Sequence, residues 1–246
     1  MVKKKWKPTH SQVVGTAAAL PGLLLIGTRG TSHALLSYPV RYLLAHTSIA
    51  GAVVAAASTK LLCKFTTGLF GKSKQGKLSL LCCGIFYPFQ VAIRTKLLYR
   101  RRHGTEPLYS HVVDKYWIGG WPNSPTALPD SEAAVVDCTC ELPRRHSNPY
   151  LCVATWDTHS PSIEGFDQGV EFATEQRKDG RPILVHCAHG HGRSAAMLCA
   201  ILISAGKAKS INDAEAMLQR KRPRVRLNKN QREGLTRWLE QKHKKK

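Results

Sequence analysis

The sequence predicts an α/β domain with a mixed or parallel central sheet flanked by helices, preceded by a helical, membrane-associated N-terminal region. Charge divides the chain: residues 1–105 hold sixteen Lys and Arg and no Asp or Glu, whereas residues 106–246 hold twenty-one basic and all sixteen acidic residues. Short apolar segments alternate with helical patterns only in the second part. We therefore expect an N-terminal membrane region over 1–105 and a globular domain over 106–246.

Four short apolar segments in the second part predict strands, and the helical patterns between and after them predict helices on the faces of a sheet. The expected strands are Tyr116–Ile118, Ala134–Cys138, Tyr150–Ala154 and Ile183–His186. The expected helices run over 162–176 with Ser162 as a cap, over 194–204, from Ser210 or Asn212 to Pro223, and from Asn228 into the Lys tail.

Three apolar runs, Val13–Ile26, Leu43–Ala57 and Leu78–Ile93, lie in the first part. Each is shorter than the ~20 residues that span a bilayer comfortably, although flanking residues can extend the first two. The basic clusters around them favour the cytoplasmic side. We expect two spans, with the third run re-entrant or interfacial and the C-terminal domain in the cytosol. Three spans would force one basic cluster outside.

The N-terminal composition also leaves two other interpretations open. An acid-free, basic N-terminus is typical of a targeting peptide for an organelle, either mitochondrion or plastid. A soluble helical hairpin packed on the C-terminal domain is the third option. The formal net charge of +21 invites a nucleic-acid partner, but the basic residues interrupt apolar runs and no base-reading motif is present. Anionic lipid headgroups are the more natural partner, and no nucleic-acid partner is expected.

The segment 185–194 joins a buried strand to an apolar helix through a glycine-bearing loop. The strand delivers Cys187 to the carboxyl edge of the sheet, where ligand sites of such sheets collect. Backbone N–H groups over 188–193 are expected to curl inward, with Gly190 and Gly192 permitting the angles required. Such a nest at a helix N-terminus binds a tetrahedral anion such as phosphate. The expected phosphate-binding positions are Ala188, His189, Gly190, His191, Gly192 and Arg193.

The positive electrostatic field of the loop N–H groups and the helix N-terminus should lower the pKa of Cys187, because a thiol at a helix N-terminus beside positive charge ionises readily. The planar fork of Arg193 suits two phosphate oxygens. Ser194 can donate a hydrogen bond to the Cys187 sulfur and help it leave. The loop therefore predicts a nucleophilic cysteine that accepts a phosphoryl group.

His186, Cys187, Arg193 and Ser194 match the H-C-x5-R-S signature of protein tyrosine and dual-specificity phosphatases, and the chain resembles this superfamily over about Leu108–Leu239. The motif lies well inside the domain, as in dual-specificity enzymes, whereas low-molecular-weight phosphatases carry C-x5-R near the start. The resemblance implies the dual-specificity phosphatase fold, hydrolysis of phosphomonoesters through a phosphocysteine, a supporting role for His186, and no cofactor or metal.

That family uses a general acid from a loop about thirty residues before the cysteine. Asp157 lies thirty residues before Cys187 and follows a predicted strand. It would protonate the leaving oxygen and later activate water. Asp167 is the competitor, but it falls inside a predicted helix.

Two further segments carry a weaker resemblance. Tyr116–Pro122 looks like the opening strand motif of dual-specificity phosphatases, or it is simple core packing. Arg222-Pro223 and Asn228–Gln231 resemble the branch that includes mitochondrial phosphatidylglycerophosphate phosphatase. In that alignment Gln231 could support the site, or it could lie on the surface.

Eight cysteines spread through apolar stretches indicate reduced thiols, without disulfides. Cys138 and Cys140 are expected to be strand residues, and the role of Cys152 is open. A metal site built from His186, Cys187, His189 and His191 is conceivable, but the surrounding glycines and arginine serve phosphate binding better.

The sequence is consistent with three functions. The first is a membrane-anchored dual-specificity or tyrosine phosphatase acting on phosphoproteins. The second is a phospholipid phosphatase, for phosphatidylglycerophosphate or a phosphoinositide. The third is a phospho-binding pseudophosphatase, which the intact Cys187, Arg193 and Asp157 disfavour. His189 and His191 would line the pocket rim, either charging as pH falls or serving as neutral walls.

Overall fold

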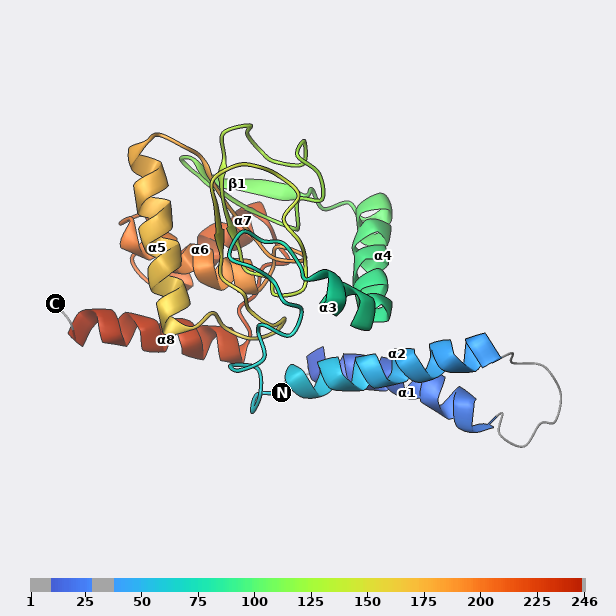
Figure 1. Cartoon of the computed structure of the whole chain (residues 1–246). Coiled ribbons are helices and arrows are strands. Elements are labelled where there is room, and N and C mark those ends of the chain that lie inside the picture. The colour runs from blue at the N-terminus through green and yellow to red at the C-terminus, as the bar shows by residue number, and fades with distance from the viewer. Residues whose placement is uncertain (1–9, 28–37, 245–246) are drawn as a thin grey trace.

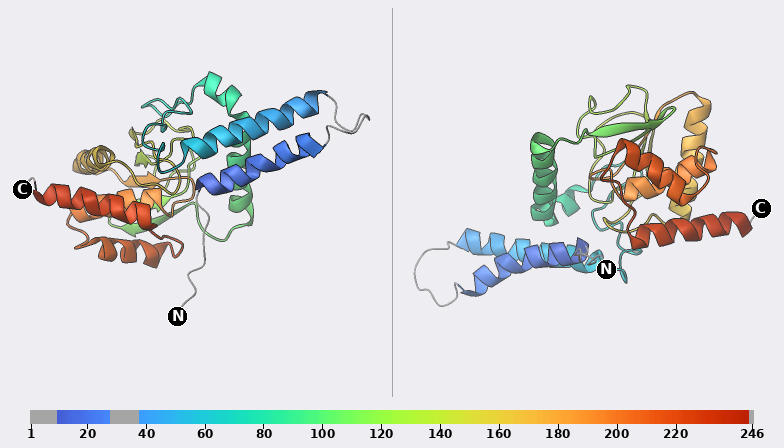
Figure 2. Two further views of the ribbon diagram at one scale, coloured as in Figure 1. Left: turned by 90° about the horizontal axis from the view of Figure 1, so that it is seen from below. Right: turned by 180° about the vertical axis from the view of Figure 1, so that it is seen from behind.

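The computed structural model describes residues 10–27 and 38–244. Helices α1 (His10–Gly27) and α2 (Tyr38–Ala57) lie side by side as a hairpin that projects from the rest of the molecule (Figure 1). The view from below shows the two helices running along each other (Figure 2). A coil over 58–79 then leads to α3 (Leu80–Ile85) and α4 (Tyr87–His103), which lie beside the globular domain.

The domain is built on a mixed five-stranded sheet in the order β1-β2-β5-β3-β4. Its strands are β1 (Tyr109–Val113), β2 (Tyr116–Gly119), β3 (Ala134–Asp137), β4 (Tyr150–Cys152) and β5 (Ile183–His186). β1 pairs antiparallel with β2, and every other pairing is parallel. β5 is central and fully buried, as a run of Ile, Leu and Val with partners on both sides should be. Asp137 of β3 lies opposite His186 of β5, so the chain leaves both strands at the same edge of the sheet.

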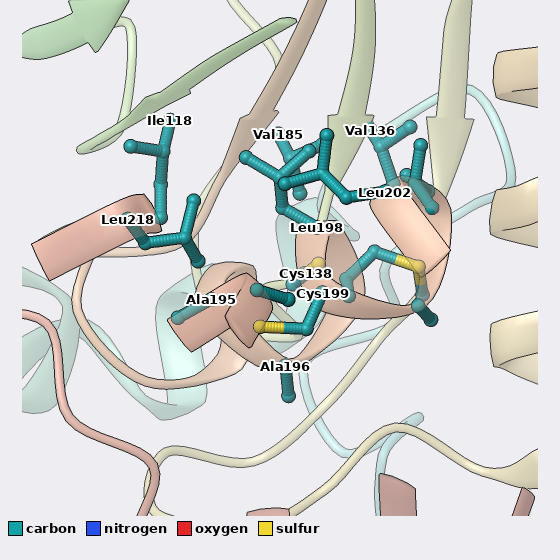
Figure 3. Close-up of a cluster of buried hydrophobic side chains, with 14 of the residues drawn as sticks. Ile118, Val136, Cys138, Val185, Ala195, Ala196, Leu198, Cys199, Leu202 and Leu218 are labelled. Carbon is teal, nitrogen blue, oxygen red and sulfur yellow. The ribbon is translucent and has the colours of Figure 1, made fainter. Parts of the chain in front are cut away.

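Four helices follow or separate the strands: α5 (Ile163–Lys178), α6 (Arg193–Ser204), α7 (Ile211–Lys221) and α8 (Lys229–Lys244). Ser162 and Ser210 cap α5 and α7 by accepting from backbone N–H groups in the first turn, as Ser at this position commonly does. α6 is the apolar centre, buried from Arg193 to Leu202. Ile118, Val136 and Val185 of the sheet lie opposite Leu198 and Leu202 of α6 and Leu218 of α7 (Figure 3).

The other face of the sheet is not covered by α5, α6, α7 or α8. Val135 and Leu184 pack there against Leu128, with Tyr109, Trp117 and Tyr150 around them. This cover comes mainly from the long connection between β2 and β3 and from neighbouring strands. The face is therefore closed by large side chains.

The coil over 58–79 packs directly against the domain. Phe70 is 1% exposed and contacts Phe86 and Trp156 through ring centroids 5.5 Å apart in both cases. Burial of one such side chain contributes roughly 1.5–3 kcal/mol. Farther along, the backbone N–H of Arg144 donates to the carbonyl oxygen of Gly76 at 2.9 Å. The coil is thus integrated into the fold, although its composition resembles that of the N-terminal helices.

The strand predicted over Ile183–His186 is confirmed, and three others agree to within two residues. β1 was not predicted, because Ser110 and His111 interrupt its apolar pattern. The assignment of Cys138 and Cys140 to a strand was wrong: β3 ends at Asp137, whose side chain accepts from the Thr139 N–H at 2.8 Å and turns the chain. Both cysteines are nevertheless buried, and all eight are free thiols.

Among the described residues, α2 is the helix whose length and composition would allow it to cross a membrane. α1 continues through Pro21, and its apolar part is shorter. The third apolar run forms two helices and not one, because α3 ends before Phe86 and α4 begins after it. One candidate span is therefore present where two were expected, and the multi-pass arrangement stays a prediction.

Candidate active site

Cys187 lies directly after β5, at the mouth of the loop that leads into α6. Its N–H donates to the carbonyl oxygen of Gly119 in β2 at 3.3 Å, and the N–H of Trp121 donates to the carbonyl oxygen of Ala188 at 3.3 Å. The cysteine is 3% exposed. The parallel strands on both sides therefore fix the start of the loop.

Two glycines allow the loop to curl tightly. Gly190 has φ +80°, and a Cβ there would lie 2.6 Å from the carbonyl carbon of Gly119. A Cβ on Gly192 would lie 2.7 Å from Nε2 of Gln231. Gly192 is also the N-cap of α6 and offers no side chain to the first N–H groups of that helix. Those groups are free to face an anion, as at other helix N-termini that bind phosphate.

The Cys187 sulfur receives two hydrogen bonds, from the Gly190 N–H at 3.2 Å and from Ser194 Oγ at 3.4 Å. Burial pushes the pKa of the thiol upward, but the Arg193 guanidinium and the hydrogen bonds from Ser194 outweigh it. The net pKa of Cys187 lies below its ordinary value. The arrangement favours a thiolate at the base of an anion-binding loop.

Arg193 is held by Glu141, which lies in the loop after β3. Both terminal nitrogens of the guanidinium bind the carboxylate, at 2.8 and 2.9 Å, and one of them also donates to the Thr155 carbonyl oxygen at 2.8 Å. Among the described residues, its Nε makes no hydrogen bond, although Asp157 Oδ1 lies 3.4 Å away. Because an Arg guanidinium carries five N–H groups, the edge that contains Nε remains available to bind two oxygens of an oxyanion.

Of the two candidate acids, Asp157 is the one that the structure brings to the loop. It contacts Arg193 and keeps 44% of its side chain exposed, so that it can reach a bound ligand. Asp167 lies within α5, where Oδ1 accepts from Trp238 Nε1 at 2.8 Å and from Lys242 at 2.9 Å. These partners belong to α8, and they fix Asp167 in a structural contact between the two helices.

Behind the cysteine, His186 joins a buried network that sequence reasoning missed. Asp137 Oδ1 lies 3.7 Å from His186 Nε2, and Oδ2 accepts from Lys72 Nζ at 2.7 Å and from the Tyr150 hydroxyl at 2.8 Å. Lys72 Nζ also donates to the Thr139 carbonyl oxygen at 2.7 Å. Burial disfavours the charged forms, yet the pair holds the pKa of Asp137 well below and that of Lys72 above the ordinary range.

The loop histidines form one side of the mouth. His191 Nε2 lies 2.6 Å from Glu106 Oε2, and His189 Nε2 lies 3.4 Å from a terminal nitrogen of Arg100 on α4. Burial, and for His189 the charge of Arg100, lower both pKa values, that of His189 to about 3. Neutral imidazoles at physiological pH agree with the interpretation of wall residues.

Gln231 is buried beside the loop and is not on the surface. Its amide oxygen accepts from the Asn228 N–H at 3.0 Å, its amide nitrogen donates to the His159 carbonyl oxygen at 3.4 Å, and it abuts Gly192. It links α8 to the loop and to the segment carrying Asp157. Within residues 10–27 and 38–244, no group of three or more His, Cys, Asp or Glu side chains could hold a metal ion.

Several of the site residues were not identified from the sequence, among them Glu141 and Lys72. Glu141 had a usable signal: it follows a strand that ends beside the cysteine strand, so its side chain had to lie near the same edge. Lys72 had none, because it precedes Asp137 by 65 residues in a basic segment.

A cysteine with a lowered thiol pKa at the end of a central parallel strand, under a helix N-terminus and an arginine fork, defines a cysteine-dependent phosphatase. Residues 131–241 match the dual specificity phosphatase catalytic domain. The chain is 29% identical over 116 residues to the dual specificity protein phosphatase OPG106 of variola virus, covering 45% of this chain and 67% of the relative. Residues 131–241, less than half of the chain, thus resemble the cysteine-based dual-specificity phosphatases, and the chain is a phosphoric monoester hydrolase.

Solved structures with the same fold are more distant. A point variant of human DUSP28 is 19% identical with a TM-score of 0.50, and the match covers 57% of this chain and all of that one. PTPMT1 in complex with PI(5)P is 22% identical with a TM-score of 0.48, over 54% of this chain and 95% of that one. In both cases the match covers little more than half of this chain.

Proposed function

We propose that the chain is a membrane-anchored phosphatase that hydrolyses phosphomonoesters through a phosphocysteine intermediate. The Cys187 thiolate attacks phosphorus while the loop N–H groups and Arg193 hold the phosphoryl oxygens. Asp157 donates its proton to the leaving oxygen, so that the product departs as a neutral alcohol or phenol. Asp157 then takes a proton from the water that attacks the phosphocysteine, and Ser194 stabilises the thiolate that is released.

The observation that carries this proposal is the pair of hydrogen bonds on the Cys187 sulfur beneath the N-terminus of α6. A thiol in this position is a nucleophile and not merely a buried apolar group. By contrast, burial raises the pKa of Cys138, Cys140 and Cys199 above the ordinary value. Among these four buried cysteines, Cys187 is the one whose thiol pKa is lowered, as a nucleophile requires.

The direct test is Cys187→Ser in the full chain. Turnover of a generic aryl phosphate should be abolished, while orthovanadate or inorganic phosphate still binds, because the N–H groups and Arg193 remain. Cys199→Ser is the matched control, since that thiol is equally buried but lies within α6. Undiminished activity in Cys187→Ser would rule out the mechanism.

For the substrate, we propose a phosphorylated protein. The viral relatives are named dual specificity protein phosphatases, and the match covers most of the domain that carries the loop. The mouth also holds a cation, because Arg100 of α4 lies beside His189. An acidic phosphopeptide segment would be attracted to such a mouth.

For the anchor, we propose that α2 crosses the membrane and carries α3 with it. His46 Nε2 lies 2.7 Å from the carbonyl oxygen of Ile85 at the end of α3. His46 precedes the end of α2 by eleven residues, about 16 Å along a helix. A span by α2 would therefore take α3 to membrane depth, which supports a re-entrant or interfacial third run. Leu80 and Leu81 of α3 are highly exposed and suit a lipid environment.

This arrangement favours a second candidate, an anionic phospholipid substrate. A membrane anchor holds the domain near lipid headgroups, and the basic end of α4, Arg100–His103, can contact them. The full chain in detergent should be assayed side by side on phosphopeptides, phosphatidylglycerophosphate and phosphoinositides. A rate on one lipid at least tenfold above every phosphopeptide would replace the protein assignment.

Topology needs a separate experiment. With the basic clusters on the cytosolic side, a C-terminal tag should be cleaved when protease is added to intact cytosolic-side-out vesicles. Protection of the tag until detergent is added would place the domain in the lumen or inside an organelle.

A further inference from the structure

The turn that carries Asp157 is short and strained. The His159 N–H donates to the Trp156 carbonyl oxygen at 3.1 Å, and Thr158 takes a left-handed φ of +66°. Asp157 itself is almost half exposed, so packing of its own side chain does not fix its direction. Besides the contact of its side chain with Arg193, its position depends on the residues on either side of it.

The residue before Asp157 is anchored outside the catalytic domain. Trp156 is 2% exposed, its Nε1 donates to Thr66 Oγ1 at 3.1 Å, and its ring packs on Phe70 at 5.5 Å. Both partners lie in the coil that follows α2. Because a buried indole N–H without an acceptor costs free energy, this bond fixes the orientation of the ring.

The other end of the turn is anchored in the same coil. His159 Nε2 lies 2.9 Å from the carbonyl oxygen of Ser58, the first residue after α2. Burial lowers the pKa of His159, so the ring is neutral and donates through Nε2. The opposite side of the turn is held within the domain, since Asn228 Nδ2 donates to the Thr158 carbonyl oxygen at 2.8 Å.

The coil is in turn tied to the end of α2. The Thr66 hydroxyl lies 2.7 Å from the carbonyl oxygen of Ala57, the last residue of α2, and 3.0 Å from that of Leu62. A single hydroxyl thus accepts from Trp156 and donates to a carbonyl of the coil or of the helix end. The contacts run from α2 through Thr66 to the residue adjacent to Asp157.

We propose that residues 58–70, here called the brace, position Asp157 for proton transfer, with Thr66 and Phe70 as positioning residues. The brace acts by holding Trp156 and His159, between which Asp157 is presented to the leaving oxygen near Arg193. This inference rests on the proposed role of Asp157 as general acid. It makes the acid step depend on a segment that is continuous with the membrane helix.

The test is a leaving-group comparison on the full chain in detergent. Phenyl phosphate releases a phenol that needs a proton, because its pKa is near that of Tyr, about 10. 4-Nitrophenyl phosphate releases a far more acidic phenol and depends less on an acid. Thr66→Val, which keeps the volume but removes the acceptor, should lower the single-turnover rate on phenyl phosphate about tenfold, part of the 10²–10⁴-fold that general acids supply. The rate on 4-nitrophenyl phosphate should change less than about twofold.

Three further variants test the same proposal. Thr66→Ser keeps the hydroxyl and should restore the phenyl phosphate rate. Phe70→Leu keeps an apolar contact and should show the same selective loss in milder form. Thr47→Val removes a hydroxyl of α2 that lies outside the brace and donates to the Leu43 carbonyl oxygen at 2.8 Å, and should leave both rates unchanged.

Asp157→Asn separates the two hypotheses. A selective loss on phenyl phosphate confirms the acid, and adding Thr66→Val to it should then lower the rate no further. If Asp157→Asn shows no selectivity, the assignment of the acid fails. If Asp157→Asn is selective while Thr66→Val changes neither rate, or changes both equally, the brace inference fails alone.

Discussion

The two parts of the chain differ in what they leave on their surfaces. Every large apolar side chain that is exposed in the described residues lies between Val13 and Tyr99, and residues 106–244 expose none. The first part also has no acid, whereas the second part holds all sixteen. The second part thus buries its apolar residues internally, while the first part leaves large apolar side chains exposed, which supports the proposed contact with lipid.

The coil over 58–79 belongs to the first part by composition and to the second by packing. Lys72 and Phe70 are completely or almost completely buried against the domain, while Leu61 and Phe65 are more than three-quarters exposed. The change of charge near residue 105 therefore does not coincide with the edge of the packed domain. Four predictions probe this distinction, beginning with the largest expected effect.

The first prediction concerns the apolar surface of α2. Ile49 and Val53 are exposed on that helix. Replacing both with Lys should cost about 5–7 kcal/mol of membrane insertion, since each charge near the centre of a span costs about 2.5–3.5 kcal/mol. The variant should be extracted from membranes by alkaline carbonate, while the wild type stays in the membrane pellet.

The control for this experiment places the same charges just beyond α2. Leu61→Lys with Leu62→Lys adds two cations beside Lys60 and Lys64, where the headgroup region tolerates them. This variant should resist extraction. Equal release of both variants, or of neither, would show that α2 does not span the bilayer.

The second prediction concerns Lys72, the buried cation that the coil supplies to the domain. Lys72→Met leaves the Asp137 carboxylate without its cation, and breaking a buried pair costs about 3–5 kcal/mol. The free energy of unfolding should fall by this amount, measured by urea titration of the full chain in detergent. Lys74→Met, on an exposed side chain of the same coil, should change it by less than about 0.5 kcal/mol.

The pair also predicts a pH window for this loss. The pKa of Asp137 is depressed, so its contribution is present above the ordinary value of 3.8 and is lost as pH falls below it. The pKa of Lys72 is raised, so its contribution is present below 10.5 and is lost as pH rises through the folded value. The difference between wild type and Lys72→Met should be constant from about pH 5 to 9 and shrink toward pH 3. A difference that grows below pH 4 would contradict the assigned signs.

These residues also show what the sequence can and cannot reveal. The β5 strand, the loop and Arg193 follow from local patterns of apolar residues, glycines and a basic residue at the start of a helix. Asp157 follows from the spacing that the family resemblance implies. Lys72 does not, because it is one of ten lysines in an acid-free segment and its partner lies 65 residues away. Its pairing with Asp137 depends on tertiary packing, so the residues next to Lys72 in the sequence do not predict it.

The third prediction concerns Glu141, which holds the Arg193 guanidinium from within the domain. Glu141→Gln removes the bidentate carboxylate and lets the fork shift, and small displacements at a reacting centre cost roughly 10²-fold in rate. The value of kcat/KM on an aryl phosphate should fall by about that factor. Glu171→Gln, on the exposed side of α5, is the matched control. An unchanged rate for Glu141→Gln would mean that phosphate alone orients Arg193.

The last prediction has the smallest effect and tests the contact between α4 and the loop. The pKa of His189 is lowered to about 3, by burial first and then by Arg100. The ring is therefore neutral from pH 5 to 8, and His189→Asn should leave the shape of the pH–rate profile unchanged within about twofold in that range. Arg100→Gln should move the pKa of His189 upward, as measured by NMR titration of the ring. Because burial is the larger cause, the pKa should still remain below its ordinary value of 6.5. A His189 pKa that does not respond to Arg100→Gln would show that the first part of the chain does not act on the electrostatics of the loop.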